Sequence, residues 1–339
     1  MNKYIFLKLK IILHGIIQKK ITIKKLWNTF VCFFSYFFKL KLSGRTPILV
    51  SVDLWNECNE NCVFCRSSKG EIYNLNKSNN DEFKFISKGK LELQTFKNIV
   101  NEICDTSIMI IPYINGEPLM YKDIYSAINY ANNKKLLTLI ASNGILLNER
   151  NSEKLITSGL DFLKVHTSGF SNEIHSIQHR KGNAEKIYEN LKRFTFLKKK
   201  LNSKVILMLD YILYNHNKHE LQLAKKFADE NEILFNIRPG NPYGMEGTEN
   251  TQPAKDMKKQ ACDWPWKAVS INWDGSVIPC CEYVVWKGAS PHKNYSEQNL
   301  FNTWNGSSYI KFRNEHKNNG RVNLEVCKDC PRQGLGFKF

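Results

Sequence analysis

The sequence predicts an α/β protein with a parallel sheet, followed by a smaller cysteine-rich unit. From residue 47 to about residue 238, six apolar runs typical of strands alternate with amphipathic segments typical of helices. A length of 339 residues suits one large domain and a smaller one. Eight of the ten cysteines fall into an early and a late set. Because the start of the chain does not resemble a cleavable signal peptide, we expect a cytoplasmic protein whose cysteines bind metal.

The predicted elements follow one another in regular alternation. Each strand is a short apolar run, and each helix repeats its apolar residues every three or four positions. The predicted strands are 48–54, 107–114, 136–141, 162–167, 204–214 and 232–238. The predicted helices are 91–103, 121–133, 148–158, 183–198 and 218–230. Crossover helices between successive strands imply that the strands run parallel.

The first 45 residues form a basic amphipathic helical extension in this prediction. They carry nine lysines and Arg45 but no acidic residue. The densest apolar part, residues 29–38, is too short to span a bilayer. These helices either pack on the rest of the protein with solvated lysines, or lie on an anionic membrane surface, or bind an acidic partner. The remaining 294 residues are only mildly basic, so we expect no nucleic-acid partner.

Three cysteines stand directly after the first predicted strand. Cys58, Cys62 and Cys65 have C-x3-C-x2-C spacing. Three thiolates this close can hold three irons of a cubane cluster and leave the fourth iron open. Ligands bind at the carboxyl ends of parallel strands, so this is a fitting place for an active site. The alternative is that these cysteines supply half of the ligands of a zinc site. A disulfide framework fits less well, because a chain of this length can form a stable core without disulfide bonds.

This spacing, with the aromatic Phe64 before the last cysteine, resembles the signature of radical S-adenosylmethionine (SAM) enzymes. The resemblance implies a partial (βα)6 TIM-type barrel over residues 46–246. It also implies a [4Fe-4S] cluster on the three cysteines, with SAM on the open iron. In that family, reductive cleavage of SAM gives a 5′-deoxyadenosyl radical that abstracts a substrate hydrogen. An external electron donor of the flavodoxin or ferredoxin type is then a required partner.

Short motifs after the later strands extend the resemblance. Residues 114–119 are similar to the Gly-Gly-Glu-Pro motif of the family, which implies that Asn115, Gly116 and Glu117 contact the SAM amino group. Ser142 lies in a segment similar to Thr-Asn-Gly-x-Leu-Leu and is a candidate SAM contact. Arg180 is similarly implied to meet the SAM carboxylate, for which a guanidinium group is well suited.

The strand at 162–167 departs from the family pattern Val-Ser-Ile-Asp-Gly. His166 stands where a serine is common, and Ser168 stands where an aspartate is common. We therefore do not assign to this strand the contact with the SAM ribose that the family pattern would imply. A polar stretch at 66–90 is predicted to be either a lid or a flexible loop.

The late cysteines form a second candidate metal site. Cys262 and Cys280 are spaced C-x17-C, Cys327 and Cys330 are spaced C-x2-C, and two such pairs can make a four-thiolate site. Taken alone, zinc is an alternative occupant. The spacing resembles the SPASM domain of radical SAM enzymes in its shortened "twitch" form, which implies one auxiliary [4Fe-4S] cluster within residues 247–339. Cys281 is the spare cysteine that could replace Cys280.

The resemblance points to dehydrogenation or epimerisation of a sugar-like or aminocyclitol substrate. A peptide-modifying enzyme of the same superfamily is the alternative, and a non-catalytic zinc-binding protein is the competitor from another class. Cys104 and Cys281 are weak candidates for a hydrogen donor. Four polar side chains near strand ends are expected to face the barrel mouth: His166, Asp210, Tyr211 and Arg238.

Overall fold

The computed structural model describes residues 3–63, 65, 88–240, 259–281, 293–324, 327–328 and 330. Phe64, most of the polar stretch at 66–90 and most of the predicted linker at 247–261 lie outside the described residues.

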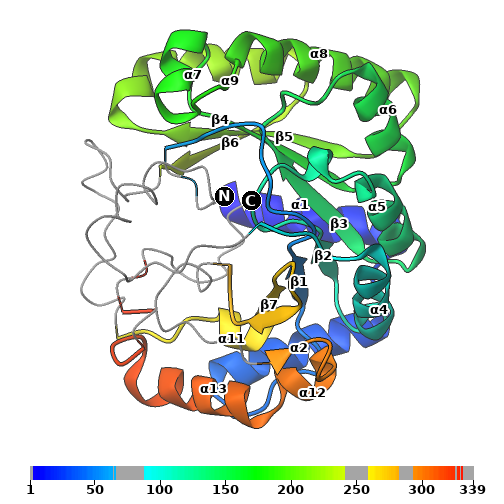
Figure 1. The fold of residues 1–339 in the computed structure, drawn as a ribbon, viewed down its shortest axis with the longest axis vertical. Coiled ribbons are helices and arrows are strands. Elements are labelled where there is room, and N and C mark those ends of the chain that lie inside the picture. The colour runs from blue at the N-terminus through cyan, green and yellow to red at the C-terminus, as the bar shows by residue number, and fades with distance from the viewer. Residues whose placement is uncertain are drawn as a thin grey trace.

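The described strands form a nine-stranded sheet in the order β6-β5-β4-β3-β2-β1-β7-β8-β9 (Figure 1). The strands from β6 to β7 pair in parallel, and β7–β8 and β8–β9 pair antiparallel. The strands are β1 (Leu49–Val52), β2 (Met109–Ile111), β3 (Leu137–Ser142), β4 (Phe162–Thr167), β5 (Ile206–Leu213), β6 (Leu234–Pro239), β7 (Ala268–Ile271), β8 (Ser276–Ile278) and β9 (Lys293–Asn294). All six predicted strands are confirmed.

The five predicted helices are also confirmed, with ends shifted by a few residues. They are α4 (Leu93–Ile103), α5 (Ile124–Asn133), α6 (Glu149–Thr157), α8 (Ala184–Lys200) and α9 (Leu221–Glu230). The short elements η1 (Pro118–Met120), α7 (Asn172–Gln178) and η2 (Asn215–Glu220) were not predicted. Side-chain caps define several helix starts; for example, Asn148 accepts a hydrogen bond from the backbone of Asn151 before α6.

The cysteine-rich unit joins the same sheet as the first six strands. Its strand β7 pairs in parallel with β1, so Val50 lies beside Val269. The Asp274-Gly275 dipeptide makes the turn between β7 and β8, where Gly275 has φ of +83°. The unit also contains the helices α11 (Trp264–Lys267), α12 (Leu300–Trp304) and α13 (Ser307–Asn319). Trp304 and the Arg313 guanidinium stack in its buried interior, 4.5 Å apart.

The two faces of the strands bury different partners. Alternate residues, such as Val50, Ile110 and Leu163, pack beneath the helices in the larger apolar cluster. The intervening residues, such as Leu49 and Phe162, form a smaller cluster with Ile11. This alternation follows from the two-residue period of a strand, and it leaves one face of the sheet turned toward the barrel interior.

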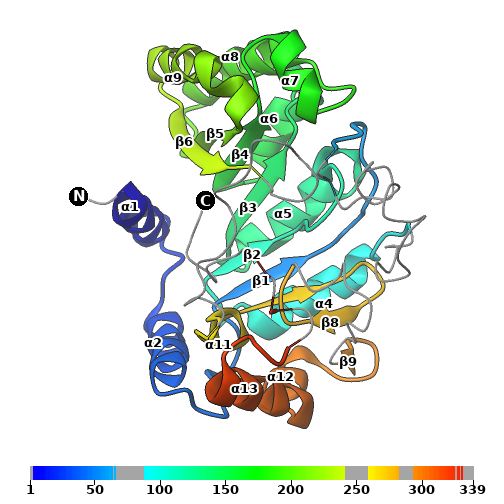
Figure 2. The ribbon, with the colours of Figure 1, turned by 90° about the vertical axis from the view of Figure 1, so that its left-hand side faces the viewer.

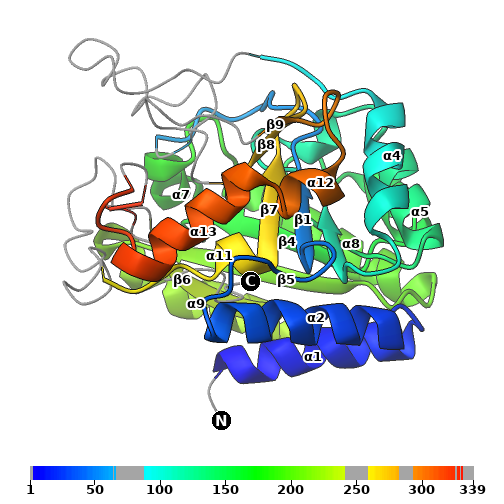
Figure 3. The ribbon, with the colours of Figure 1, turned by 90° about the horizontal axis from the view of Figure 1, so that it is seen from below.

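Two N-terminal helices, α1 (Lys3–Ile17) and α2 (Ile23–Phe37), lie along one side of the molecule (Figures 2 and 3). The Asp161 carboxylate, just before β4, accepts hydrogen bonds from His14 of α1 (3.0 Å) and from Lys20 (2.6 Å). In α2, Asn28 donates to the backbone oxygens of Thr46 and Thr106, which precede β1 and β2. Both helices therefore pack at the amino ends of the strands. In the described part of the chain, no helix is long and apolar enough to cross a membrane.

Candidate active site

The first three cysteines lie on the loop that follows β1, at the carboxyl edge of the sheet. Backbone hydrogen bonds join this loop to the end of α7 and the residues that follow it: Val63 N donates to Gln178 O (3.0 Å), and Asn61 N donates to Arg180 O (2.9 Å). A further bond joins Glu117 N to Glu57 O (2.8 Å). Segments far apart in the sequence thus fix the position of the cysteine loop.

The turn at 115–117 packs directly against the backbone before Cys58. Gly116 has φ of +73°, and a Cβ atom there would press on Glu57 O and lie 2.8 Å from the carbonyl carbon of Asn56. Only glycine fits both the conformation and the space. The Asn115 amide donates to the buried carboxylate of Asp53 (3.0 Å), and burial raises the pKa of Asp53 to about 6. The Asn115 side chain is therefore engaged in holding the turn.

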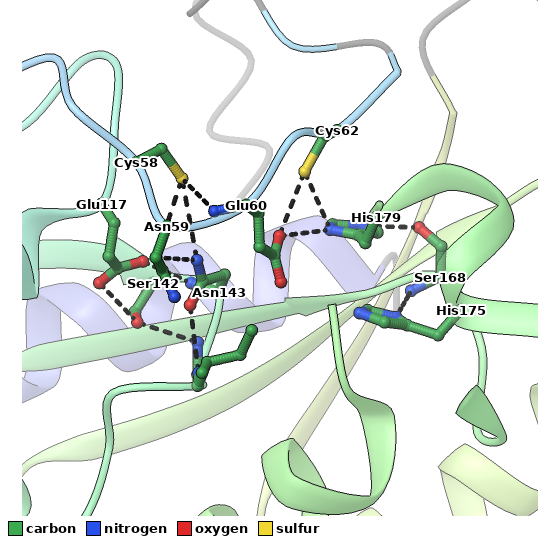
Figure 4. Close-up of polar contacts among 12 residues, drawn as sticks. Cys58, Asn59, Glu60, Cys62, Glu117, Ser142, Asn143, Ser168, His175 and His179 are labelled. Atoms are coloured by element: carbon green, nitrogen blue, oxygen red, sulfur yellow. Dashed lines mark hydrogen bonds and ion pairs between the residues drawn. The ribbon is translucent and has the colours of Figure 1, made fainter. Parts of the chain in front are cut away.

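The Glu117 carboxylate is buried and links this turn to the end of β3 (Figure 4). It accepts hydrogen bonds from Ser142 Oγ (2.9 Å) and from Asn143 N (2.8 Å). Burial raises the pKa of Glu117 to about 7. The predicted SAM contact Ser142 thus has its hydroxyl proton directed at Glu117. Asn143 was not predicted, yet its amide donates to Asn59 Oδ1 (2.8 Å) in the cysteine loop.

A second polar chain, also missed from the sequence, reaches Cys62. The Cys62 thiol donates to Glu60 (3.1 Å) and lies 3.4 Å from His179 Nδ1. His179 contacts Glu60 through Nδ1 (3.1 Å) and Ser168 Oγ through Nε2 (3.0 Å) (Figure 4). The ligand atoms of Glu60, Cys62 and His179 lie within 4.8 Å of one another and could hold a metal ion. Ser168, at the position of a common family aspartate, is thereby tied to the cysteine loop.

Arg180 is exposed, and its backbone oxygen accepts the Asn61 bond described above. The arginine is therefore adjacent to the cysteine loop, where a bound carboxylate could reach it. Phe64, the remaining predicted cofactor contact, lies outside the described residues.

The donor set fits an iron–sulfur cluster. Burial raises the pKa of Cys58 to about 12 and that of Cys62 well above its usual range. The neighbouring Cys65 raises both pKa values further. Such thiols stay protonated in the absence of metal and lose their protons to it on binding. Three soft sulfur ligands on one loop suit iron.

The late cysteines also gather at one place. Burial raises the pKa of Cys280 well above its usual range, and neighbouring Cys281, Cys327, Cys330 and Cys262 raise it further. Cys327 Sγ lies 4.0 Å from His316 Nε2, and the same ring accepts a hydrogen bond from Cys262 N (3.4 Å). The five late thiols are thus close enough for their charges to influence Cys280, which fits a four-thiolate centre with Cys280 or Cys281 as the fourth ligand.

Polar side chains also gather on the barrel-facing side of β4 to β6. The fully buried Asp210 accepts hydrogen bonds from Arg238 Nε (2.6 Å) and Asn236 Nδ2 (2.5 Å), and His166 Nε2 lies 3.4 Å away. Three of the four expected mouth residues are therefore brought together. The expectation for Tyr211 is wrong: its ring packs beneath the helices, and its hydroxyl donates to Asn217 O (2.9 Å). Tyr211 follows Asp210 in a strand, so it points to the opposite face.

The two candidate hydrogen-donor thiols differ in location. Cys104 ends α4, just before β2, and therefore lies at the amino edge of the sheet, away from the cysteine loop. Cys281 perturbs the pKa of Tyr113, which burial raises and which Arg238 and Asp210 also influence. Cys281 therefore shares a neighbour, Tyr113, with the polar groups of the barrel interior, whereas Cys104 lies at the opposite edge of the sheet.

Two family models match the chain. The model of the radical SAM superfamily matches residues 52–227, more than half of the chain. The model of the SPASM iron–sulfur cluster-binding domain matches residues 262–331. These ranges include the early and the late cysteine set respectively.

Curated relatives share limited identity with the chain. The AdoMet-dependent heme synthase of Methanosarcina barkeri (strain Fusaro / DSM 804) is 28% identical over 131 residues, which is 39% of this chain. The match spans only about a third (34%) of that relative's length. The PqqA peptide cyclase of Granulibacter bethesdensis (strain ATCC BAA-1260 / CGDNIH1) is 23% identical over 330 residues, with 86% of this chain and 81% of the relative covered.

Solved structures share the fold. Streptococcus suis SuiB gives a TM-score of 0.59 at 13% identity, with 85% of this chain and 73% of that chain covered. BtrN in complex with AdoMet and 2-DOIA gives a TM-score of 0.50 at 15% identity, with 84% and 93% covered. The parallel sheet, the three-cysteine loop and the late thiol cluster agree with these matches: the chain belongs to the radical SAM superfamily, with a [4Fe-4S] cluster and SAM as its cofactors and a SPASM domain that binds auxiliary iron–sulfur.

Proposed function

We propose that this radical SAM enzyme oxidises an alcohol carbon of a sugar-like or aminocyclitol molecule, with one auxiliary [4Fe-4S] cluster as the electron acceptor. Cys58, Cys62 and Cys65 would hold the first cluster. Cys262, Cys280, Cys327 and Cys330 would hold the auxiliary cluster. Asn115, Gly116, Glu117, Ser142 and Arg180 would surround SAM. The likeness to BtrN, whose crystal contained AdoMet and 2-DOIA, supports this substrate class.

The observation that carries the proposal is the polar cluster of His166, Asp210 and Arg238 in the barrel interior. Burial alone would raise the pKa of Asp210, but Lys164 and Arg238 hold it well below its usual range. Burial, together with the charge of Arg238, lowers the pKa of His166 well below its usual value. Asp210 is fully buried, so the groups that a ligand can reach are the partly exposed Arg238 guanidinium and the neutral His166 imidazole that surround the carboxylate. Such groups hydrogen-bond well to hydroxyl and amino substituents.

The cofactors supply a carbon radical that removes one hydrogen atom from the substrate carbon. Conversion of an alcohol to a ketone also releases one proton and one electron. His166 is the candidate proton acceptor by position: its Nε2 atom makes no hydrogen bond among the described residues, and it lies 3.4 Å from the Asp210 carboxylate, which would stabilise the imidazolium formed when the proton is taken up. The electron would pass to the auxiliary cluster, and an external flavodoxin- or ferredoxin-type donor would supply the electron for the next turnover.

A deuterium-transfer assay tests the substrate class. The reconstituted enzyme is incubated with SAM, a reductant and carbon-deuterated aminocyclitols or sugars. The proposal expects deuterium in 5′-deoxyadenosine and a ketone product in equal amounts. An inverted stereocentre with solvent hydrogen incorporated would indicate epimerisation, and Cys281→Ala would then show whether Cys281 is the donor.

Peptide modification is the second candidate, because the PqqA peptide cyclase matches along 86% of this chain. SuiB, which has been crystallised with the precursor peptide SuiA, shares the fold. If deuterated peptides, and not the small alcohols, label 5′-deoxyadenosine in the same assay, the small-molecule proposal is wrong and this candidate replaces it.

A further inference from the structure

Helices α1 and α2 form one side of the molecule (Figures 2 and 3). That side is unusually apolar for a surface. Among the described residues, fifteen of the twenty-one exposed large apolar side chains lie between residues 9 and 42. Scattered apolar residues are normal on a protein surface, but a concentration on two neighbouring segments marks an interaction site.

Helix α2 has its polar side turned inward and its aromatic side turned outward. Its buried residues are Lys25, Asn28, Cys32 and Ser35. The Lys25 ammonium donates to Lys135 O, and Asn28 donates to Thr46 O (2.9 Å) and Thr106 O (3.1 Å), so these contacts fix the rotation of the helix. A helix that docks on a protein core normally shows the reverse arrangement.

The outward side of α2 carries an aromatic stripe. Trp27 is 66% exposed, Phe30 is 56% exposed and Phe37 is 76% exposed. Successive rings contact one another: Trp27 stacks on Phe30 at 5.6 Å, and Phe34 lies 4.5 Å from Phe38. Their spacing of three and four residues places them on one face of the helix.

Helix α1 presents a second stripe beside the first. Ile11 is buried against the sheet, and His14 is bound to Asp161, so the opposite face must point outward. That face carries Leu9, Ile12, Leu13, Ile16 and Ile17, each about half exposed or more. The anchored polar contacts hold both stripes on the same side of the protein.

Basic groups border the stripes. Lys19 is exposed in the turn between the helices and Lys24 in the first turn of α2, and Lys41 and Arg45 are exposed beyond the end of α2. Residues 1–45 contain no acidic side chain to neutralise them. Exposed apolar and aromatic side chains flanked by exposed basic groups match the interface of an anionic bilayer.

We propose that α1 and α2 dock this protein onto the surface of an anionic lipid membrane. Each helix has 15 residues, whereas a span needs about 20, so the helices lie in the interface and do not cross the bilayer. Two copies packed face to face would bring the same basic groups together with no acid between them, which disfavours a homodimer as the occupant.

The docked orientation follows from the packing of the helices. Both helices contact residues that precede strands, such as Thr46 and Asp161, whereas the cysteine loop follows β1 at the opposite edge of the sheet. The membrane therefore faces the amino edge, and the active site opens toward the aqueous side.

Vesicle flotation of the reconstituted full-length protein tests this proposal. The probes are vesicles of phosphatidylglycerol with phosphatidylcholine, and vesicles of phosphatidylcholine alone. We expect at least tenfold more bound protein on the anionic vesicles, and weaker binding in high salt because salt screens the charges. The variant Trp27→Glu/Phe34→Glu should lower binding at least tenfold. The matched control Phe196→Glu, at an aromatic residue on α8 that is 65% exposed, should leave binding unchanged.

Two results would overturn the proposal. One is equal flotation of the protein and of the Trp27→Glu/Phe34→Glu variant. The other is a dimer, seen by light scattering, that the same variant dissociates while no vesicle binding occurs. Iron content and SAM cleavage, measured on every variant, report folding and the catalytic function separately from membrane binding.

Discussion

At the scale of single residues, Gly116 shows why a short motif can be read from sequence. Its left-handed φ and its close contact with the backbone of residues 56–57 both require glycine. A glycine at this position in the sequence therefore already indicates a tight turn. Asn143 and His179 carry no such signal. Their roles depend on contacts across 84 and 117 positions of the chain, which no local pattern encodes.

We predict that Gly116→Ala displaces the cysteine loop. The substitution adds strain on the order of 1–3 kcal/mol at a left-handed φ and pushes the turn away from Glu57. SAM affinity, measured by calorimetry on the reconstituted enzyme, should fall at least tenfold. Gly159→Ala is the control: it has the same backbone penalty at φ of +79°, but the new methyl group meets only the Asn132 side chain. An equal loss of SAM affinity in both variants would contradict the assigned role of the turn.

At the scale of elements, the sequence predicts the strands and crossover helices because their periodicity reflects burial on one face. The same reasoning does not determine which way α2 faces, because its apolar stripe is compatible with packing on the protein, with a membrane surface and with a partner. The structure buries Lys25 and Asn28 and turns the stripe outward. Lys135, Thr46 and Thr106 supply oxygen atoms to these polar groups, and a helical pattern contains no information about such distant acceptors.

We predict that Asp161→Asn loosens α1 from the barrel. The carboxylate accepts bonds from His14, Lys20 and Thr138, and removal of one partner from a buried ion pair costs on the order of 3 kcal/mol. Although burial alone would raise the pKa of Asp161, these partners lower it below its usual value. Its stabilising contribution is therefore present above an unfolded pKa of about 3.9 and is lost as pH falls through the lower folded pKa.

Urea unfolding of both forms across pH 2 to 7 checks this prediction. The difference in unfolding free energy between the wild type and Asp161→Asn should be constant near neutral pH and shrink in acid. A difference that grows in acid would show that Asp161 is not held as a carboxylate.

At the scale of the whole molecule, the radical SAM core and the SPASM unit share one sheet through the β1–β7 pair. The sequence indicates two cysteine sets in two units, but it does not show this pairing, because parallel partners more than 200 residues apart leave no local pattern. The shared sheet positions the late cysteines relative to the early ones.

We predict that the early and the late cysteine set bind their iron independently of each other. The wild-type protein should bind about eight irons per chain, and Cys327→Ala/Cys330→Ala should retain about four. Cys104→Ala is the control and should retain all of the iron, since Cys104 lies at the amino edge of the sheet. Zinc in the late site, or full iron content in the double variant, would show that the late set holds no iron–sulfur cluster.

The release of 5′-deoxyadenosine from SAM under anaerobic, reducing conditions tests the central claim most directly. The reconstituted wild-type protein and Cys104→Ala should release it, whereas Cys58→Ala/Cys62→Ala/Cys65→Ala should release none while it keeps the iron of the late site. Release of 5′-deoxyadenosine by the triple variant, or its absence from an iron-loaded wild-type protein, would contradict the assignment of radical SAM chemistry to the loop after β1.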